Sequence, residues 1–192
     1  MLIKRIKLGF SIYFYRLLSK KFKSFGENVK IIFPLGIDGF SNISVGNNVV
    51  VNYKTWLAAV PLTSDSVSLQ IGEGTIIGNF NHIYATKSIN IGKKVLTADK
   101  VYISDNLHGY ENINIPIMDQ PIVQNGSVEI GDGTWIGENA CILGVNIGKN
   151  CVIGSNSVVT HDIPDYCVAV GSPAKIIKRY CVESMKWIIV KD

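Results

Sequence analysis

The stretch that decides the fold is VEIGDGTWIGENACILGVNIGKNCVIGSNSVV, residues 128–159. Aliphatic residues recur in it at intervals of six, at Ile130, Ile136 and Ile142 and again at Ile147, Ile153 and Val159. The same interval occurs earlier, at Ile71, Ile77, Ile83 and Ile89. A period of six fits neither an α-helix, whose side chains recur about every 3.6 residues, nor the two-residue alternation of one strand. It predicts stacked coils with three flat faces, in which each six-residue unit points one aliphatic side chain into a common apolar column.

The residues between the aliphatic positions support such a prism. Four residues further on come small or β-branched residues that suit an interior corner: Thr75, Val95, Val101, Thr134, Ala140, Cys151 and Ser157. Lys87 breaks this rule, which indicates an irregular unit, and the five-residue step from Ile142 to Ile147 predicts a tightened corner near Gly144. Asparagines are expected at turn positions that tolerate φ > 0, namely Asn79, Asn139, Asn150 and Asn156.

The pattern divides the chain into a helix, a repeat region with one long insertion, and a tail. We expect a basic amphipathic helix over residues 1–25 and an irregular start of the prism over residues 26–60. Regular coils should run from Leu69 to Ile103, resume at Val128 and end near Ile163–Pro164. Residues 104–127 have no period and should project as a loop, where insertions in repeat folds often carry function. Residues 181–192 are expected to form a short apolar tail.

The N-terminal segment holds the excess positive charge. Residues 1–25 contain seven basic residues and no acidic one, so the net charge of +4 for the whole chain leaves −3 for the rest. Apolar residues recur there at helical spacing, at Ile3, Ile6, Phe10, Tyr13, Phe14 and Leu17. Two interpretations stay open: the helix packs on the open base of the prism, or it also lies on an anionic membrane surface.

Composition and charge argue against a membrane-spanning, a secreted and a nucleic-acid-binding protein. The longest uncharged run of residues 1–25, Leu8 to Tyr15, is far shorter than the about 20 residues that span a bilayer, and a secretory signal is not expected. Nucleic-acid binding is not expected either, because no basic groove lines the repeat region. The four cysteines show no C-x-x-C spacing and are interpreted as reduced, which is typical of the cytoplasm.

Three segments together resemble the hexapeptide-repeat acyltransferases: residues 128–140, residues 147–164 and GSPAKIIK at 171–178. The resemblance covers roughly residues 41–180 and is most similar to sugar O-acetyltransferases of the galactoside and maltose type and their capsule and lipopolysaccharide relatives. It implies an all-β fold, a left-handed parallel β-helix, with an acetyltransferase domain over residues 26–180. It also implies a homotrimer with active sites at the subunit interfaces, acetyl-CoA as the acetyl donor and a saccharide acceptor.

The inserted loop contains the expected base, His108. An acyl transfer to a hydroxyl needs a group that accepts a proton near neutral pH, and histidine suits that task. The loop reads Asp105-Asn106-Leu107-His108-Gly109-Tyr110, where many relatives have D-H-x-H-G-Y, so His108 is the local base that remains. The resemblance implies direct transfer without an acyl-enzyme. It also implies that the backbone N–H of Glu138 meets the oxyanion.

The resemblance implies roles for further residues. Asn79 is expected to contact the acceptor from the adjacent subunit, with turn stacking as the alternative, and Trp135 to lie beside the catalytic histidine. Asn81 and Tyr110 are weaker candidates for acceptor contacts, and Asp105 is expected either to orient His108 or to bind a sugar hydroxyl. The implied CoA contacts are Gly137, Ser155, Thr160, His161, Lys175 and Lys178, although relatives usually have lysine where this chain has His161.

Other functions are weighed against these expectations. The spacing of His82, His108 and His161 does not fit a zinc site, so no metal is expected. An amino-sugar N-acetyltransferase remains an alternative, but such relatives usually begin with a nucleotide-binding domain, and serine acetyltransferases have a longer helical domain. A non-catalytic β-helical scaffold is the other alternative. We therefore expect a saccharide O-acetyltransferase in the cytoplasm, with peripheral contact to the inner membrane left open.

Overall fold

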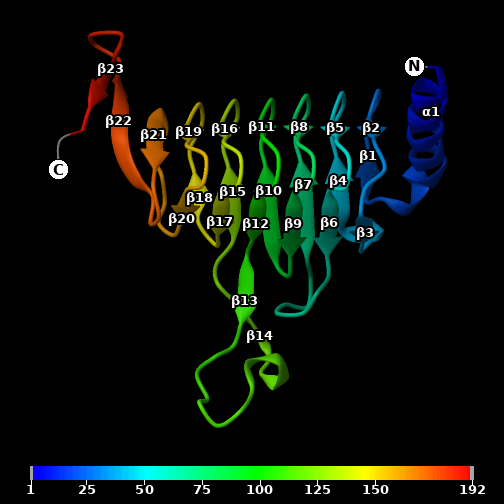
Figure 1. Cartoon of the computed structure of the whole chain (residues 1–192), viewed down its shortest axis with the longest axis horizontal. Coiled ribbons are helices and arrows are strands. Elements are labelled where there is room, and N and C mark those ends of the chain that lie inside the picture. Colours follow the sequence, from blue (N-terminus) through cyan, green and yellow to red (C-terminus); the bar gives the residue numbers. More distant parts are fainter. Residues whose placement is uncertain (1, 191–192) are drawn as a thin grey trace.

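The computed structural model describes residues 2–190, and the side chains of residues 8–190. The predicted prism is present as a left-handed parallel β-helix, with helix α1 at one end and a C-terminal hairpin at the other (Figure 1). Each face of the prism is one parallel sheet, because every coil adds one strand to each face. The inward aliphatic residues of the period-six pattern, such as Ile77, Ile83 and Ile136, are fully buried.

The faces are named sheet A, sheet B and sheet C. Sheet A contains β1 (Ser24–Phe25), β4 (Ile43–Val45), β7 (Ser68–Ile71), β10 (Ser88–Ile91), β15 (Val128–Ile130) and β18 (Asn146–Ile147). Sheet B begins with β2 (Lys30–Ile31), β5 (Val50–Val51), β8 (Ile76–Ile77), β11 (Leu96–Thr97), β16 (Trp135–Ile136) and β19 (Val152–Ile153). Sheet C contains β3 (Gly36–Asp38), β6 (Trp56–Ala59), β9 (His82–Ala85), β12 (Tyr102–Ser104), β17 (Cys141–Leu143) and β20 (Val158–Val159).

The corners between the sheets follow the predicted pattern closely. The expected corner residues from Thr75 to Ser157 are all buried, whereas Lys87 is exposed. Asn139, Asn150 and Asn156 have positive φ as predicted, but beside Asn79 it is Phe80 that takes this conformation. At the short corner, Gly144 has φ +62°, and its N–H donates to the carbonyl of Ser104 in the coil before.

The N-terminal helix is shorter than predicted. Helix α1 covers Leu2–Leu17, the 3₁₀ turn η1 covers Leu18–Lys21, and the first coil begins at β1 rather than after residue 25. That coil is regular, although its repeat is hard to recognise because aromatic side chains replace aliphatic ones. Phe22 is buried against Phe25 and Phe40, at ring-centroid distances of 5.0 and 4.9 Å. A second short 3₁₀ turn, η2 (Phe40–Asn42), leads from β3 into β4.

The C-terminal part also differs from the prediction. Pro164 lies in a turn, where the ladder needs no N–H, and β21 (Cys167–Val170) continues sheet B in parallel with β19. The chain then reverses, and β22 (Lys175–Cys181) and β23 (Lys186–Ile189) add two antiparallel strands to sheet B. The expected tail over residues 181–192 is thus largely a hairpin, and its last two residues lie outside the described ones.

The insertion is a second hairpin that projects from the corner between sheets C and A (Figure 1). Strand β13 (Asn106–His108) pairs antiparallel with β14 (Ile122–Gln124), and the loop between them contains the 3₁₀ turn η3 (Ile117–Asp119). In residues 2–190, no helix has the length and apolar character needed to cross a bilayer.

Candidate active site

His108 lies at the end of β13, opposite Ile122 of β14. The antiparallel pairing and a hydrogen bond from the Gly109 N–H to the carbonyl of Pro121 fix the backbone here. The imidazole is exposed and makes no hydrogen bond or ion pair with any other described side chain. It is therefore free to accept a proton from a bound molecule.

Asp105, expected either to orient His108 or to bind a sugar hydroxyl, forms structural hydrogen bonds within the described chain. Its carboxylate is fully buried and accepts five hydrogen bonds, including those from the N–H groups of Thr86, Lys87 and Ser88 at 2.8 Å. Lys87 thus interrupts the hexad at the point where its backbone binds Asp105. The bonds attach the root of the hairpin to the preceding coil.

Side chains that were not among the predicted site residues also hold the base of the hairpin. Gln124 of β14 contacts Thr63 and Thr86, and its Nε2 donates to the carbonyl of Asp105 at 2.7 Å. Sequence reasoning missed these residues because they lie up to 61 positions apart. Polar residues within an otherwise aliphatic repeat were the available signal, but only the stacking of coils pairs them.

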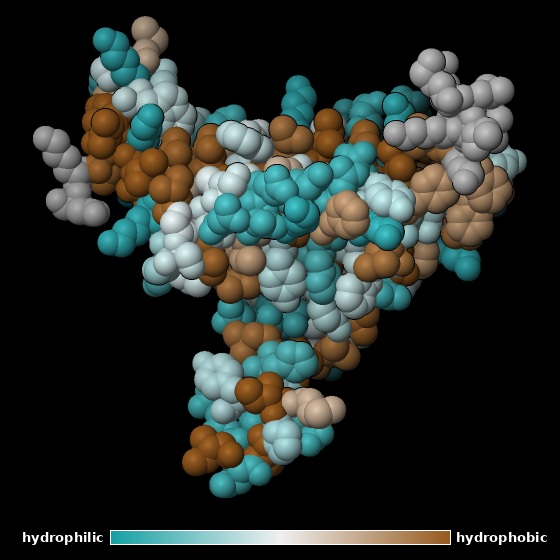
Figure 2. All heavy atoms as spheres, viewed as in Figure 1, coloured by the Kyte–Doolittle hydropathy of each residue, from teal (hydrophilic) through white to brown (hydrophobic). Residues whose placement is uncertain are grey.

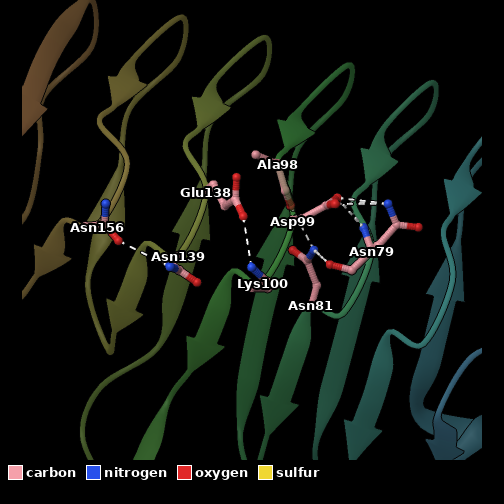
Figure 3. Close-up of polar contacts among 8 residues, drawn as sticks. All are labelled: Asn79, Asn81, Ala98, Asp99, Lys100, Glu138, Asn139 and Asn156. Carbon is pink, nitrogen blue, oxygen red and sulfur yellow. Dashed lines mark hydrogen bonds and ion pairs between the residues drawn. The ribbon is translucent and has the colours of Figure 1, made fainter.

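Glu138 lies on a different corner, between sheets B and C, in the turn after β16. Its carboxylate forms an exposed ion pair with Lys100 at 3.1 Å (Figure 3). In two earlier coils of this corner, the turn N–H donates to a side chain of the next coil: Tyr53 to Asn79 at 3.2 Å, and Asn79 to Asp99 at 2.8 Å. The N–H groups of Asp99 and Glu138, at the same position in the two following coils, have no acceptor among the described residues. A free backbone donor at this position fits the expected oxyanion contact.

Asn79 takes part in that series of turn contacts. Its Nδ2 donates to both carboxylate oxygens of Asp99, at 3.0 and 3.1 Å, and the next coil carries this aspartate 20 residues later (Figure 3). The structure therefore gives Asn79 the turn-stacking role that was its alternative. Asn81 is buried, and its Nδ2 donates to the carbonyls of Asn79 and Ala98. Both side-chain nitrogens are thus engaged within the chain, whereas the buried Oδ1 of Asn81 has no partner among the described residues.

Gly137 is required by the stacking of coils. A Cβ on this residue would lie 2.6 Å from the amide nitrogen of Ser155 in the following coil. Trp135, two residues earlier, points outward from sheet B between Leu96 and Val152 and is 47% exposed. Within one chain it therefore lies on another face than the His108 hairpin, and not beside it.

The predicted CoA contacts are spread over the last coils. Ser155 is exposed on the corner between sheets B and C. Thr160 and His161 are exposed after β20, where the hydroxyl of Thr160 lies 3.0 Å from Nδ1 of His161. Lys175 and Lys178 are exposed on β22 and have no acidic partner among the described side chains. Tyr110 is exposed in the projecting loop.

His108 and the backbone N–H of Glu138 thus lie on separate corners of one chain. In a stack of coils the two corners cannot meet, because the prism lies between them. Within the described residues, no group of three or more His, Cys, Asp or Glu side chains is placed to hold a metal ion.

Comparisons with known proteins agree with this reading of the repeats. The family model for the hexapeptide repeat of succinyl-transferase matches residues 127–161. An Escherichia coli protein assigned as a lipopolysaccharide biosynthesis O-acetyl transferase, WbbJ, is 36% identical over 176 residues, which cover 85% of each chain. A Mycobacterium tuberculosis protein assigned as an acetyltransferase is 46% identical over 113 residues, 58% of this chain and 37% of that protein.

Among solved structures, the N-acyltransferase AntD from Bacillus cereus, in complex with dTDP and 3-hydroxybutyryl-CoA, has the same fold. It matches with a TM-score of 0.75 and 22% identity, over 91% of this chain and 92% of that one. The long match to WbbJ extends through the hairpin and both corners described above, well beyond the repeats alone. The chain therefore belongs to the hexapeptide-repeat acyltransferase family and is an acetyltransferase.

Proposed function

We propose that this protein transfers the acetyl group of acetyl-CoA to a hydroxyl of a saccharide during lipopolysaccharide or capsule synthesis in the cytoplasm. The observation that carries the proposal is the free imidazole of His108 on a fixed hairpin. The similarity to WbbJ over 85% of both chains supports an oxygen acceptor on a saccharide. The CoA complex of AntD supports a CoA thioester as the donor.

In the proposed reaction, His108 accepts the hydroxyl proton while the sugar oxygen attacks the carbonyl carbon of the thioester. The N–H of Glu138 donates to the oxyanion of the tetrahedral intermediate. When the intermediate collapses, the C–S bond breaks, and the protonated imidazole returns the proton to the sulfur of CoA. The products are the acetyl ester and free CoA, so no covalent acyl-enzyme is required.

We infer that the active form is a homotrimer in which each site takes His108 from one subunit and Glu138 from its neighbour. The separation of these two groups within one chain supports this arrangement. The CoA phosphates would meet the unpaired cations Lys175 and Lys178 near the last coils. Ser155, Thr160 and His161 would contact the remainder of the cofactor from the same end.

The first test measures release of free thiol from acetyl-CoA against a panel of sugars, sugar nucleotides and lipid-linked glycans. With the correct acceptor, His108→Ala should lower kcat about 10²-fold or more while CoA binding is kept. Asn114→Ala, a change in the same exposed loop, should retain wild-type turnover. Equal turnover of His108→Ala and the wild type would overturn the general-base role.

The nature of the product separates the two enzymatic alternatives. An O-acetyl ester is hydrolysed by mild base, whereas an N-acetyl amide is stable under the same conditions. A base-labile product is expected. A base-stable product on an amino sugar would instead identify an N-acetyltransferase, and CoA binding without turnover on any acceptor would favour a scaffold.

Shared sites can be tested by co-expressing two inactive variants with different affinity tags. Glu138→Pro removes the N–H, whereas Glu138→Ala keeps it and should retain most activity. Trimers that contain both His108→Ala and Glu138→Pro chains should regain roughly a third of wild-type turnover, because one of the three shared sites in a mixed ring keeps both groups. If both groups act within one chain, the mixed trimers will remain inactive.

A further inference from the structure

Helix α1 contacts the prism with its more polar side. Ser11 is only 3% exposed; its Oγ donates to the carbonyl of Ile31 at 3.1 Å and accepts from the N–H of Phe33 at 2.8 Å. Tyr15, one turn later on the same side, packs against the hydrophobic core, and burial raises the pKa of its hydroxyl. The helix therefore sits on β2 through a serine and a tyrosine, while its described apolar side chains Phe10, Tyr13, Phe14 and Leu17 are exposed.

The exposed side of α1 carries a row of large apolar side chains, named here the aromatic ridge: Phe10, Tyr13, Phe14 and Leu17. Their spacing of three and four residues puts them on one face of the helix. They are 66%, 61%, 43% and 62% exposed, respectively. A hollow of about 260 Å³ adjoins the ridge and is lined by Phe10, Phe14, Phe33 and Pro34. Exposed apolar area of this extent on one helix face marks an interaction surface.

Basic residues border the aromatic ridge. Arg16, Lys20, Lys21 and Lys23 are exposed, and none has an acidic partner among the described side chains. The first acidic residue of the chain is Glu27, and the chain after residue 25 has a net charge of −3. The positive charge is thus concentrated at one end of the prism. Figure 2 shows brown and tan surface at this end, next to the atoms drawn in grey.

We propose that the aromatic ridge and the basic residues beside it bind an anionic lipid bilayer. The ridge would enter the boundary between headgroups and acyl chains, and the lysines and Arg16 would contact lipid phosphates. A second copy of this chain fits the surface less well, because it would bring two strongly basic ends together. The opposite signs of this end and of a phosphate surface favour the bilayer.

Membrane binding by α1 would be independent of the proposed acetyl transfer. If the trimer proposed above forms with parallel prisms, its three α1 helices lie at one end and can bind one membrane together. The effective concentration of the second and third helix then raises the affinity beyond that of a single helix. Such an orientation would hold the enzyme at the surface where lipid-linked acceptors reside.

The experiment uses the full chain and vesicles of phosphatidylcholine with about one quarter phosphatidylglycerol, compared with phosphatidylcholine alone. The wild type should sediment with the anionic vesicles, and about 0.5 M salt should weaken this binding through screening. Phe10→Ser/Phe14→Ser should lower the partition coefficient roughly tenfold or more, because apolar burial is lost. Lys20→Glu/Lys21→Glu should lower it by a similar factor on anionic vesicles only.

The matched control is Val182→Ser/Met185→Ser, which removes two side chains that are 68% and 76% exposed in the turn of the C-terminal hairpin. It should bind vesicles as the wild type does. Light scattering on each variant gives its oligomeric mass, and turnover on a water-soluble acceptor separates membrane binding from catalysis. Wild-type protein that does not sediment with the anionic vesicles would overturn the proposal. A ridge variant that changes the oligomeric mass instead would assign the ridge to a subunit contact, which also overturns it.

Discussion

At the scale of single residues, Asp105 determines how the hairpin is attached. Its buried carboxylate accepts three backbone and two side-chain hydrogen bonds. Asp105→Asn would place an amide NH₂ against backbone donors and leave buried N–H groups without acceptors. We expect the free energy of unfolding to fall by about 2–4 kcal/mol, measured by urea denaturation.

Asp119→Asn is the matched control, since Asp119 is exposed in the same hairpin and should tolerate the change. If Asp105→Asn leaves stability intact but abolishes turnover, the carboxylate contacts the acceptor after all. That result would restore the role expected from the sequence.

Gly137 tests the close stacking of coils beside the oxyanion donor. Gly137→Ala would put a Cβ 2.6 Å from a backbone nitrogen, which cannot move without displacing the next coil. The expected loss is about 1–3 kcal/mol of stability, read from thermal unfolding. Gly9→Ala on helix α1 is the control, because a Cβ there would have no atom within 4 Å. This change should stabilise the helix by up to about 1 kcal/mol. Equal effects of the two changes would contradict the close packing at Gly137.

At the scale of elements, His82 is part of a stack of aromatic side chains on the outside of sheet C. The ring of His82 lies 4.4 Å from that of Trp56, with 12° between the planes, and 5.2 Å from that of Tyr102. Burial lowers the pKa of His82, and its buried Nε2 has no hydrogen-bond partner in the described structure. The carboxylate of Asp38, which accepts from the indole of Trp56, is the acidic group nearby in this stack.

The lowered pKa predicts a loss of stability in acid. The unfolded chain protonates its histidines near pH 6.5, before folded His82 does, so stability should fall as the pH decreases below about 6.5. His82→Phe keeps the stack and removes the proton site, so the melting temperature should then depend less on pH between about 7.5 and 5. His161→Gln, on an exposed turn, should keep the wild-type dependence. An unchanged pH dependence in His82→Phe would contradict this assignment.

At the scale of the whole molecule, sheet B presents an apolar row to the outside. Parallel register aligns the outward side chains of successive coils, Val50, Ile76, Leu96, Trp135 and Val152. Ile76, Leu96 and Trp135 are 41–47% exposed in the single chain. The matching row on sheet A is polar, with Gln70, Asn90, Glu129 and Asn146. The contrast favours sheet B as the contact face of the proposed trimer.

Leu96→Lys should therefore place an unpaired charge in the subunit contact. The expected result is a fall in mass from trimer to single chain and a loss of turnover, measured by light scattering and thiol release. Asn90→Lys, at an outward position on the polar sheet, should leave both unchanged. A trimer that tolerates Leu96→Lys would show that the subunits meet through another face.

The sequence by itself determined the prism, its interior and the position of the projecting loop, because inward direction depends only on the local period of six. It also pointed to His108 and Glu138 through the resemblance of short motifs. Tertiary structure alone decided that the side chains of Asp105 and Asn79 hydrogen-bond within the chain. It also decided that α1 contacts β2 through Ser11, and that His108 and Glu138 lie on different corners. Those outcomes depend on contacts between coils, where partners are 17 to 61 residues apart, and a local pattern carries no information about them.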